Sequence, residues 1–200
     1  MSNIGNHSLP IFEDNLPTIK EYLKIALNTV FFHRWLNNNN YIEEKSIINN
    51  ISYIKINDES LQKEINNKLS QIDNYSNNSI NLQITLSFFT KVNTQFYLFS
   101  KNDGLWEKWN FLISISNDNT PDKEGKIRTY ITKLLEELNR GNDFMPDLEL
   151  DDFGKEDSIK DNKNEFNFPY EIKILKEYEQ DSFLKILQNI NFKDTFNIKI

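Results

Sequence analysis

Two stretches of alternating apolar and polar side chains constrain the fold of this chain most. Over residues 80–88, Ile, Leu and Phe at even positions alternate with Asn, Gln, Thr and Ser. Over residues 109–115, apolar side chains occupy the odd positions. A period of two is typical of a β-strand with one buried and one solvated face. The pattern therefore predicts a mostly antiparallel or mixed sheet that is covered on one side.

Between these stretches lies an aromatic segment, residues 96–111, with six aromatic rings in sixteen residues. A polar turn, residues 101–104, interrupts the rings, so the segment cannot enter one core without burying its own turn. Some rings must then lie at the surface, where large apolar patches usually serve binding. The alternative is a half-buried hairpin in which residues 95–100 pair with residues 106–116.

The alternation divides the aromatic segment into two parts. Trp109 and Phe111 fall on the predicted core face of the strand, whereas Trp106 falls on the other face and fits either the core or a contact. The side chains left as candidates for binding another protein are Tyr97, Leu98 and Phe99.

The first predicted helix covers residues 18–36, where apolar side chains recur at steps of three and four. Thr18 with Glu21 predicts a capping box, and Pro17 is expected to stop any earlier helix.

Two further helices and two further strands complete the predicted order. Asp58 is expected to cap the second helix, and Thr120 a third helix that ends near Arg140. A β-branched strand is predicted over residues 47–56, and another begins at Pro169. This order favours an α+β domain with its helices gathered on one face of a sheet.

Composition limits the domain organisation and the class of partner. The 200 residues predict a flexible N-terminal extension over residues 1–16 and a single domain over residues 17–200, with an acidic loop at about 142–168. The net charge of −7 argues against a general nucleic-acid or anionic-membrane binder. The absence of cysteine and of an apolar leader or membrane segment favours a cytoplasmic protein.

Motifs that carry chemistry are missing. The sequence contains no phosphate-binding loop, dinucleotide fingerprint or nucleophile elbow. His33 lies at the end of the first helix without a second ligand at metal spacing, so it is expected to cap the helix or pack in the core. The sequence therefore favours a non-enzymatic protein without cofactor or metal; an enzyme of the acidic loop, through Asp151 and Asp152, is the alternative.

Several blocks resemble the autophagy-related protein 101 family, the HORMA-domain subunit of the autophagy-initiation kinase complex. The resemblance spans roughly residues 18 to 175. The blocks that carry it are Ile25–Arg34, with its Thr-Val and His-Arg pairs; Tyr53–Ile56; Leu82–Phe89; Leu105–Trp109, which is similar to Pro-Trp-Glu-x-Trp; Asn139-Arg140; Met145-Pro146; and Pro169-Tyr170 with Lys173-Ile174.

The resemblance implies a HORMA fold, three helices packed on a twisted sheet, and a non-enzymatic scaffold. Such a scaffold pairs with the HORMA domain of autophagy-related protein 13 as a heterodimer. It would act in the cytoplasm at the phagophore assembly site, recruit downstream autophagy factors and promote autophagosome formation. A peptide-clasping HORMA adaptor of the checkpoint type is the alternative.

The resemblance also implies two contact surfaces. The family carries an aromatic finger in which one proline separates a Trp from a Phe, and the matching positions here are Tyr97, Leu98 and Phe99. HORMA pairs commonly meet through the third helix, which makes Lys126 and Arg128 candidates for the dimer surface.

Overall fold

The computed structural model describes residues 4–35, 40–48, 50–75, 80–90, 104–117, 121–140 and 169–176. Within these ranges the elements follow in the order β1 (Gly5–Ser8), β2 (Phe12–Asp14), α1 (Leu16–Arg34), β3 (Tyr41–Lys45), β4 (Ser52–Ile56), α2 (Glu59–Gln71), a 3-10 turn (Ile72–Tyr75), β5 (Ile80–Phe89), β6 (Leu105–Ile115), α3 (Lys123–Arg140) and β7 (Tyr170–Lys176).

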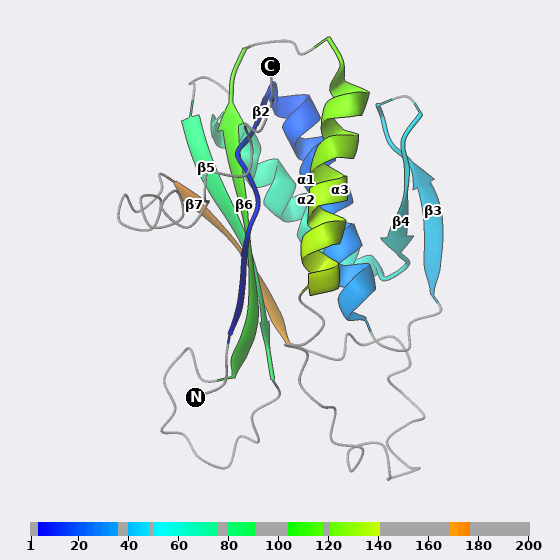
Figure 1. Ribbon diagram of the computed structural model, residues 1–200, viewed down its shortest axis with the longest axis vertical. Coiled ribbons are helices and arrows are strands. Elements are labelled where there is room, and N and C mark those ends of the chain that lie inside the picture. Colours follow the sequence, from blue (N-terminus) through cyan, green and yellow to red (C-terminus); the bar gives the residue numbers. More distant parts are fainter. Residues whose placement is uncertain are drawn as a thin grey trace, which may run out of the picture.

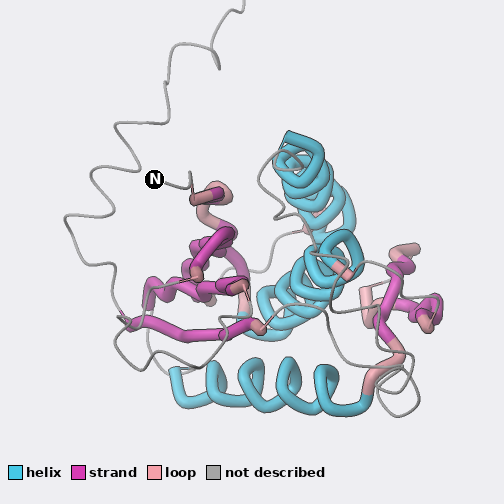
Figure 2. Tube along the Cα trace, turned by 90° about the horizontal axis from the view of Figure 1, so that it is seen from below, coloured by secondary structure: helices cyan, strands magenta, loops and turns pink. Residues whose placement is uncertain are grey.

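The main sheet has the strand order β1-β6-β5-β7, and β2 also pairs with β6. The pairs β5–β6 and β5–β7 are antiparallel, whereas β1 and β2 run parallel to β6. The helices lie on one face of this sheet, and the β3–β4 hairpin lies on the far side of the helices (Figures 1 and 2). The predicted α+β class, with three helices and a mixed, mostly antiparallel sheet, is confirmed.

Helix α1 forms the centre of the core, and twelve of its nineteen residues are buried. It begins two residues before the predicted start, because the side chain of Asn15 caps it by accepting from the backbone N–H of Thr18 at 3.1 Å. Pro17 lies inside the first turn, where its missing N–H costs nothing. The predicted Thr18–Glu21 capping box and the stop at Pro17 are therefore wrong, whereas Asp58 caps α2 as predicted.

The strand predicted over residues 47–56 is shorter than expected, since β4 covers only Ser52–Ile56. Its partner β3 was not predicted, and the two form a separate antiparallel sheet. The exposed positions of β3 carry both apolar and charged side chains, so its sequence lacks a clear alternation.

The N-terminal residues belong to the sheet. Gly5 to Ser8 pair with Glu107 to Asn110, and Phe12 to Asp14 pair with Ile113 to Ile115. Phe12 is fully buried. The prediction of a flexible extension over residues 1–16 is therefore wrong for residues 5–14, because these strands are too short to show a periodic pattern in the sequence.

The polar face of β5 is buried, although the alternation predicted a solvated one. Gln83, Thr85 and Ser87 are all nearly inaccessible. Gln83 donates from Nε2 to Oδ1 of Asn110 at 2.8 Å, and Asn110 donates in turn to the carbonyl of His7 at 3.1 Å. Buried polar side chains are tolerated when they are paired in this way.

The second half of the aromatic segment is part of the core. The structure pairs β6 with β5 over Leu105–Ile115, and the predicted partner segment, residues 95–100, lies outside the described residues. Trp109 and Phe111 are fully buried, as predicted. A register shift opposite Phe88 and Phe89 inserts one extra residue into β6, and such a bulge re-aims a side chain. The Trp106 ring consequently stacks on Phe88 with a centroid distance of 5.7 Å, which places Trp106 in the core.

Candidate functional site: a groove between α3 and the β3–β4 hairpin

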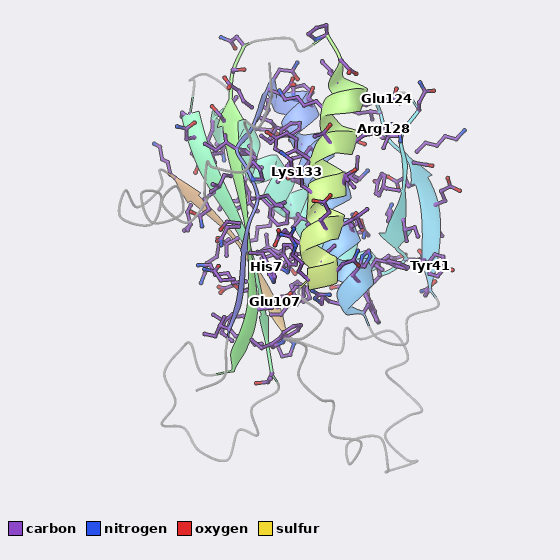
Figure 3. The ribbon with its side chains drawn as sticks, in the orientation of Figure 1. His7, Tyr41, Glu107, Glu124, Arg128 and Lys133 are labelled. Atoms are coloured by element: carbon purple, nitrogen blue, oxygen red, sulfur yellow. The ribbon has the colours of Figure 1, made fainter. Side chains whose placement is uncertain are left out.

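The two residues predicted for the dimer surface lie on different sides of α3. Lys126 is directed to β2, where its Nζ lies 3.2 Å from Oδ2 of the buried Asp14 and also contacts the carbonyl of Glu13. Arg128 is more than half exposed and faces the hairpin, where it contacts the carbonyl of Asn50. Of the two, Arg128 lines an open groove and Lys126 does not; Figure 3 labels Arg128 on the side of α3 that faces the hairpin.

This groove, of about 410 Å³, lies between α3 and β4. Its walls come from the two elements, and residues of α1 also line it. The main lining side chains are Ile25, Thr29, Phe32 and His33 of α1, Ile51, Tyr53 and Ile54 at the hairpin, and Ile127, Arg128, Ile131, Thr132 and Leu135 of α3.

The α3 wall follows from the helical period. Arg128, Ile131 and Leu135 recur at steps of three and four, so they share one face of the helix. This face differs from the one that packs into the core, where Ile127, which also borders the groove, is buried together with Leu134. The sequence showed the apolar stripe of α3 but could not show that it divides into a packed and an open part.

Large apolar side chains at the groove are exposed to solvent. Leu135 and Ile54 are each 37% exposed, on opposite walls. Tyr41, which is 50% exposed, packs its ring edge against Phe32 at a centroid distance of 5.5 Å and extends the patch along β3. Contiguous apolar surface of this kind marks an interaction site.

Among the described residues that line the groove, Arg128 carries the charge. None of the described residues that line it is acidic, although the chain carries a net charge of −7. Arg128 donates from Nε to Glu124 at 2.9 Å, an i,i+4 pair at the helix surface that contributes little energy. His33 donates from Nδ1 to the carbonyl of Thr29 at 2.8 Å, so its ring is bonded to its own helix. The groove therefore suits an apolar partner surface that carries a carboxylate.

The hairpin wall is attached to α1 by a cluster around one carboxylate. Glu44 accepts from Nζ of Lys24 and of Lys55, each at 2.6 Å, and from the hydroxyl of Tyr53 at 3.0 Å. Burial would raise the pKa of Glu44, but these hydrogen bonds lower the pKa to about 2. No local sequence pattern indicated this cluster, because its members come from α1, β3 and β4.

Other predicted site residues lie outside the described part of the chain. These are the finger residues Tyr97, Leu98 and Phe99, and the alternative pair Asp151 and Asp152. Among the residues that the structure describes, no group of three or more His, Asp or Glu side chains is placed to hold a metal ion. In the same ranges, no helix has the length and apolar character that crossing a membrane requires.

A comparison with protein families finds a match to this chain. The model of the family described as autophagy-related protein 101 matches residues 14–146, which include α1, α3 and the hairpin. No curated protein matches the chain.

Proposed function

Because the chain belongs to the autophagy-related protein 101 family, and therefore has a role in autophagy, we propose that it is a non-enzymatic scaffold of the autophagy-initiation kinase complex. In this proposal it pairs with the HORMA domain of autophagy-related protein 13 at the phagophore assembly site and promotes autophagosome formation. The observation that carries the proposal is the apolar groove beside α3, the helix through which HORMA domains commonly pair.

The chemistry of the groove supports pairing with a protein. An interface needs a few apolar anchors surrounded by polar groups, and arginine is enriched among the side chains that dominate binding energy. Leu135 and Ile54 supply exposed apolar anchors on the two walls, and Arg128 supplies the charged rim. A partner side chain that fills the groove would bury both walls at once.

Recruitment of downstream autophagy factors is assigned to the finger residues Tyr97, Leu98 and Phe99. Two aromatic rings remain in this segment, and aromatic rings are common interface anchors. The finger and the groove consist of different residues, so the proposal assigns the downstream factor and the HORMA partner to different side chains of the chain.

Co-purification tests the pairing. The chain is co-expressed with the HORMA domain of an autophagy-related protein 13 homologue from the same source, and the complex is isolated through a tag on the partner. We expect a one-to-one complex for the wild type. Leu135→Asp places a charge in the groove, and we expect it to reduce the recovered complex at least tenfold.

Leu175→Asp is the matched control. Leu175 lies on β7 and is 42% exposed, against 37% for Leu135, so the two substitutions place the same charge on similarly exposed leucines. Complex recovery with this variant should equal that of the wild type. Equal recovery for Leu135→Asp would refute the groove as the pairing surface, and failure of the wild type to bind would refute the pairing itself.

A further inference from the structure

The N-terminal residues 5–14, which we call the strap, follow α3 along much of its length. Near the start of the helix, Lys126 binds Asp14 and the carbonyl of Glu13. In its middle, the hydroxyl of Tyr130 donates to the carbonyl of Ile11 at 2.6 Å.

The strap also meets the last turns of the helix. Nδ1 of His7 lies 3.8 Å from Oε2 of Glu137, and the opposite ring nitrogen, Nε2, lies 3.2 Å from Oε1 of Glu107 on β6. His7 stacks on Trp109 with a centroid distance of 4.1 Å. It lies between the sheet and the lower half of α3, so the strap links the two (Figure 3).

The strap contacts one face of α3 and the groove occupies the opposite face. At 3.6 residues per turn, Lys126, Tyr130 and Glu137 lie within about 40° of one another around the helix. The groove residues Arg128, Ile131 and Leu135 lie about 140 to 200° from Lys126 on the same wheel. The buried side chains Ile127, Leu134 and Leu138 lie between the two faces.

The core contacts of α3 are few. Only three of its eighteen residues are buried, against twelve of nineteen in α1. A narrow buried stripe leaves the rotation and the lateral position of a helix weakly determined. Polar contacts spread from Lys126 to Glu137, about 16 Å along the axis, add the missing restraint.

Aromatic packing strengthens the same attachment. Phe12 of the strap is fully buried, meets the Tyr130 ring edge-on at 4.9 Å and stacks on Tyr22 of α1 at 4.2 Å. The Nζ of Lys126 lies 5.2 Å from the centre of the Phe12 ring. The strap is thus fixed to α1 and β6, and α3 is fixed to the strap.

We infer that the strap positions α3, and that Lys126 and Tyr130 are positioning residues for the groove on the opposite face of the helix. Because a helix moves as a rigid unit over this length, loss of the strap contacts shifts the wall that carries Arg128 and Leu135. The effect on binding rests on the proposed function, whereas the effect on α3 does not.

The test uses the full chain with Lys126→Met and Tyr130→Phe combined, which removes the polar contacts of these two residues with the strap, leaves His7 and Glu137 in place and roughly keeps side-chain volume. Hydrogen exchange is measured peptide by peptide under conditions in which circular dichroism shows a folded chain. We expect the amides of α3 to exchange at least about tenfold faster, because three hydrogen bonds that resist local opening are lost. Exchange in α1 and β5 should stay unchanged.

Two further variants separate positioning from a general loss of stability. Lys133→Met removes an exposed lysine of the same helix whose Nζ lies 5.4 Å from the centre of the Tyr130 ring, and it should leave exchange unchanged because the Tyr130 hydroxyl and Lys126 keep their bonds to the strap. The single variant Lys126→Arg keeps Tyr130 and a cation opposite Asp14, so its α3 amides should exchange at the wild-type rate. Unchanged exchange of α3 in the double variant would overturn the inference.

Binding of the autophagy-related protein 13 HORMA domain completes the test. We expect the double variant to bind at least fivefold more weakly while Lys133→Met binds like the wild type. Faster exchange of α3 with unaltered binding would overturn the positioning role and leave the pairing intact. If the wild type itself does not bind, the proposed function fails, and the exchange of α3 alone decides whether the strap positions the helix.

Discussion

Arg34 and Glu107 form a buried bidentate ion pair, with Nε to Oε2 and Nη2 to Oε1 both at 2.7 Å. Their side chains are 1% and 0% exposed, and they join the end of α1 to the middle strand β6 across 73 positions of sequence. Burial opposes ionisation of Glu107, but the hydrogen bonds from Arg34 outweigh it and lower the pKa of this carboxyl. Both groups are therefore charged in the folded protein.

Breaking this pair should strongly destabilise the chain. Glu107→Leu leaves the Arg34 guanidinium buried without its partner, and we expect the free energy of unfolding to fall by about 3–5 kcal/mol. Urea unfolding followed by circular dichroism measures the change. Glu171→Leu, at an exposed carboxylate on β7, is the control and should change stability by less than about 0.5 kcal/mol.

Replacing both partners should restore much of this loss. In Arg34→Met with Glu107→Leu no buried charge remains, and apolar replacements of such pairs are often neutral or stabilising. A double variant less stable than Glu107→Leu alone would contradict the account of the pair.

The Glu44 cluster should give the chain a pH-dependent stability. The folded pKa of Glu44, about 2, lies below its ordinary value of 4.5, so folding favours the ionised form. Its contribution is fully present above pH 4.5 and is lost as the pH falls toward 2. Because the side chain is one-quarter exposed, we expect about 1–3 kcal/mol at most.

Urea unfolding at several pH values between 7 and about 3 tests this, with Glu44→Gln beside the wild type. Between neutral pH and pH 4.5 the difference in stability between the two should be constant. Below pH 4.5 the difference in stability should shrink, because the wild type loses the ionised Glu44 carboxylate, which the glutamine variant lacks at every pH. A difference independent of pH would show that Glu44 does not stabilise the fold through its charge.

Trp106 should behave as a core residue. It is 6% exposed and stacks on Phe88, so Trp106→Ala should cost about 3–5 kcal/mol. Trp106→Phe keeps a ring against Phe88 and should cost clearly less. Both costs are read from chemical denaturation. If the alanine variant were as stable as the wild type, Trp106 would not be a core residue, and the interpretation as a surface contact would stand.

For the aromatic finger we expect the opposite result, a loss of binding without a loss of stability. Tyr97→Ala combined with Phe99→Ala should melt like the wild type but lose recruitment of downstream autophagy factors in a pull-down. Removing a true contact ring costs binding about 2 kcal/mol while it leaves folding nearly intact. If the double variant unfolds instead, these rings belong to the core and the finger is refuted.

Local patterns predicted the long elements well and the short ones poorly. The cap Asp58, the helical stripes and the strand over residues 80–88 each depend on residues within a few positions of one another, and the structure bears them out, although the polar face of that strand is buried and not solvated. The strands Gly5–Ser8 and Phe12–Asp14 have only four and three residues, too few to display an alternating pattern, and the β6 residues with which they pair lie about 100 positions further along the chain. Nothing local distinguishes such a segment from a flexible extension.

The sequence alone determined the α+β class, the helical stripes, the core positions Trp109 and Phe111, and the family of the chain. Tertiary structure alone decided that Lys126 holds the strap while Arg128, two residues on, borders the groove. It also decided that Glu107 meets Arg34 and that Trp106 is buried. Periodicity fixes which side chains share a face, because the backbone repeats every 3.6 or 2 residues. What covers each face depends on packing between distant segments, and the local pattern carries no record of it.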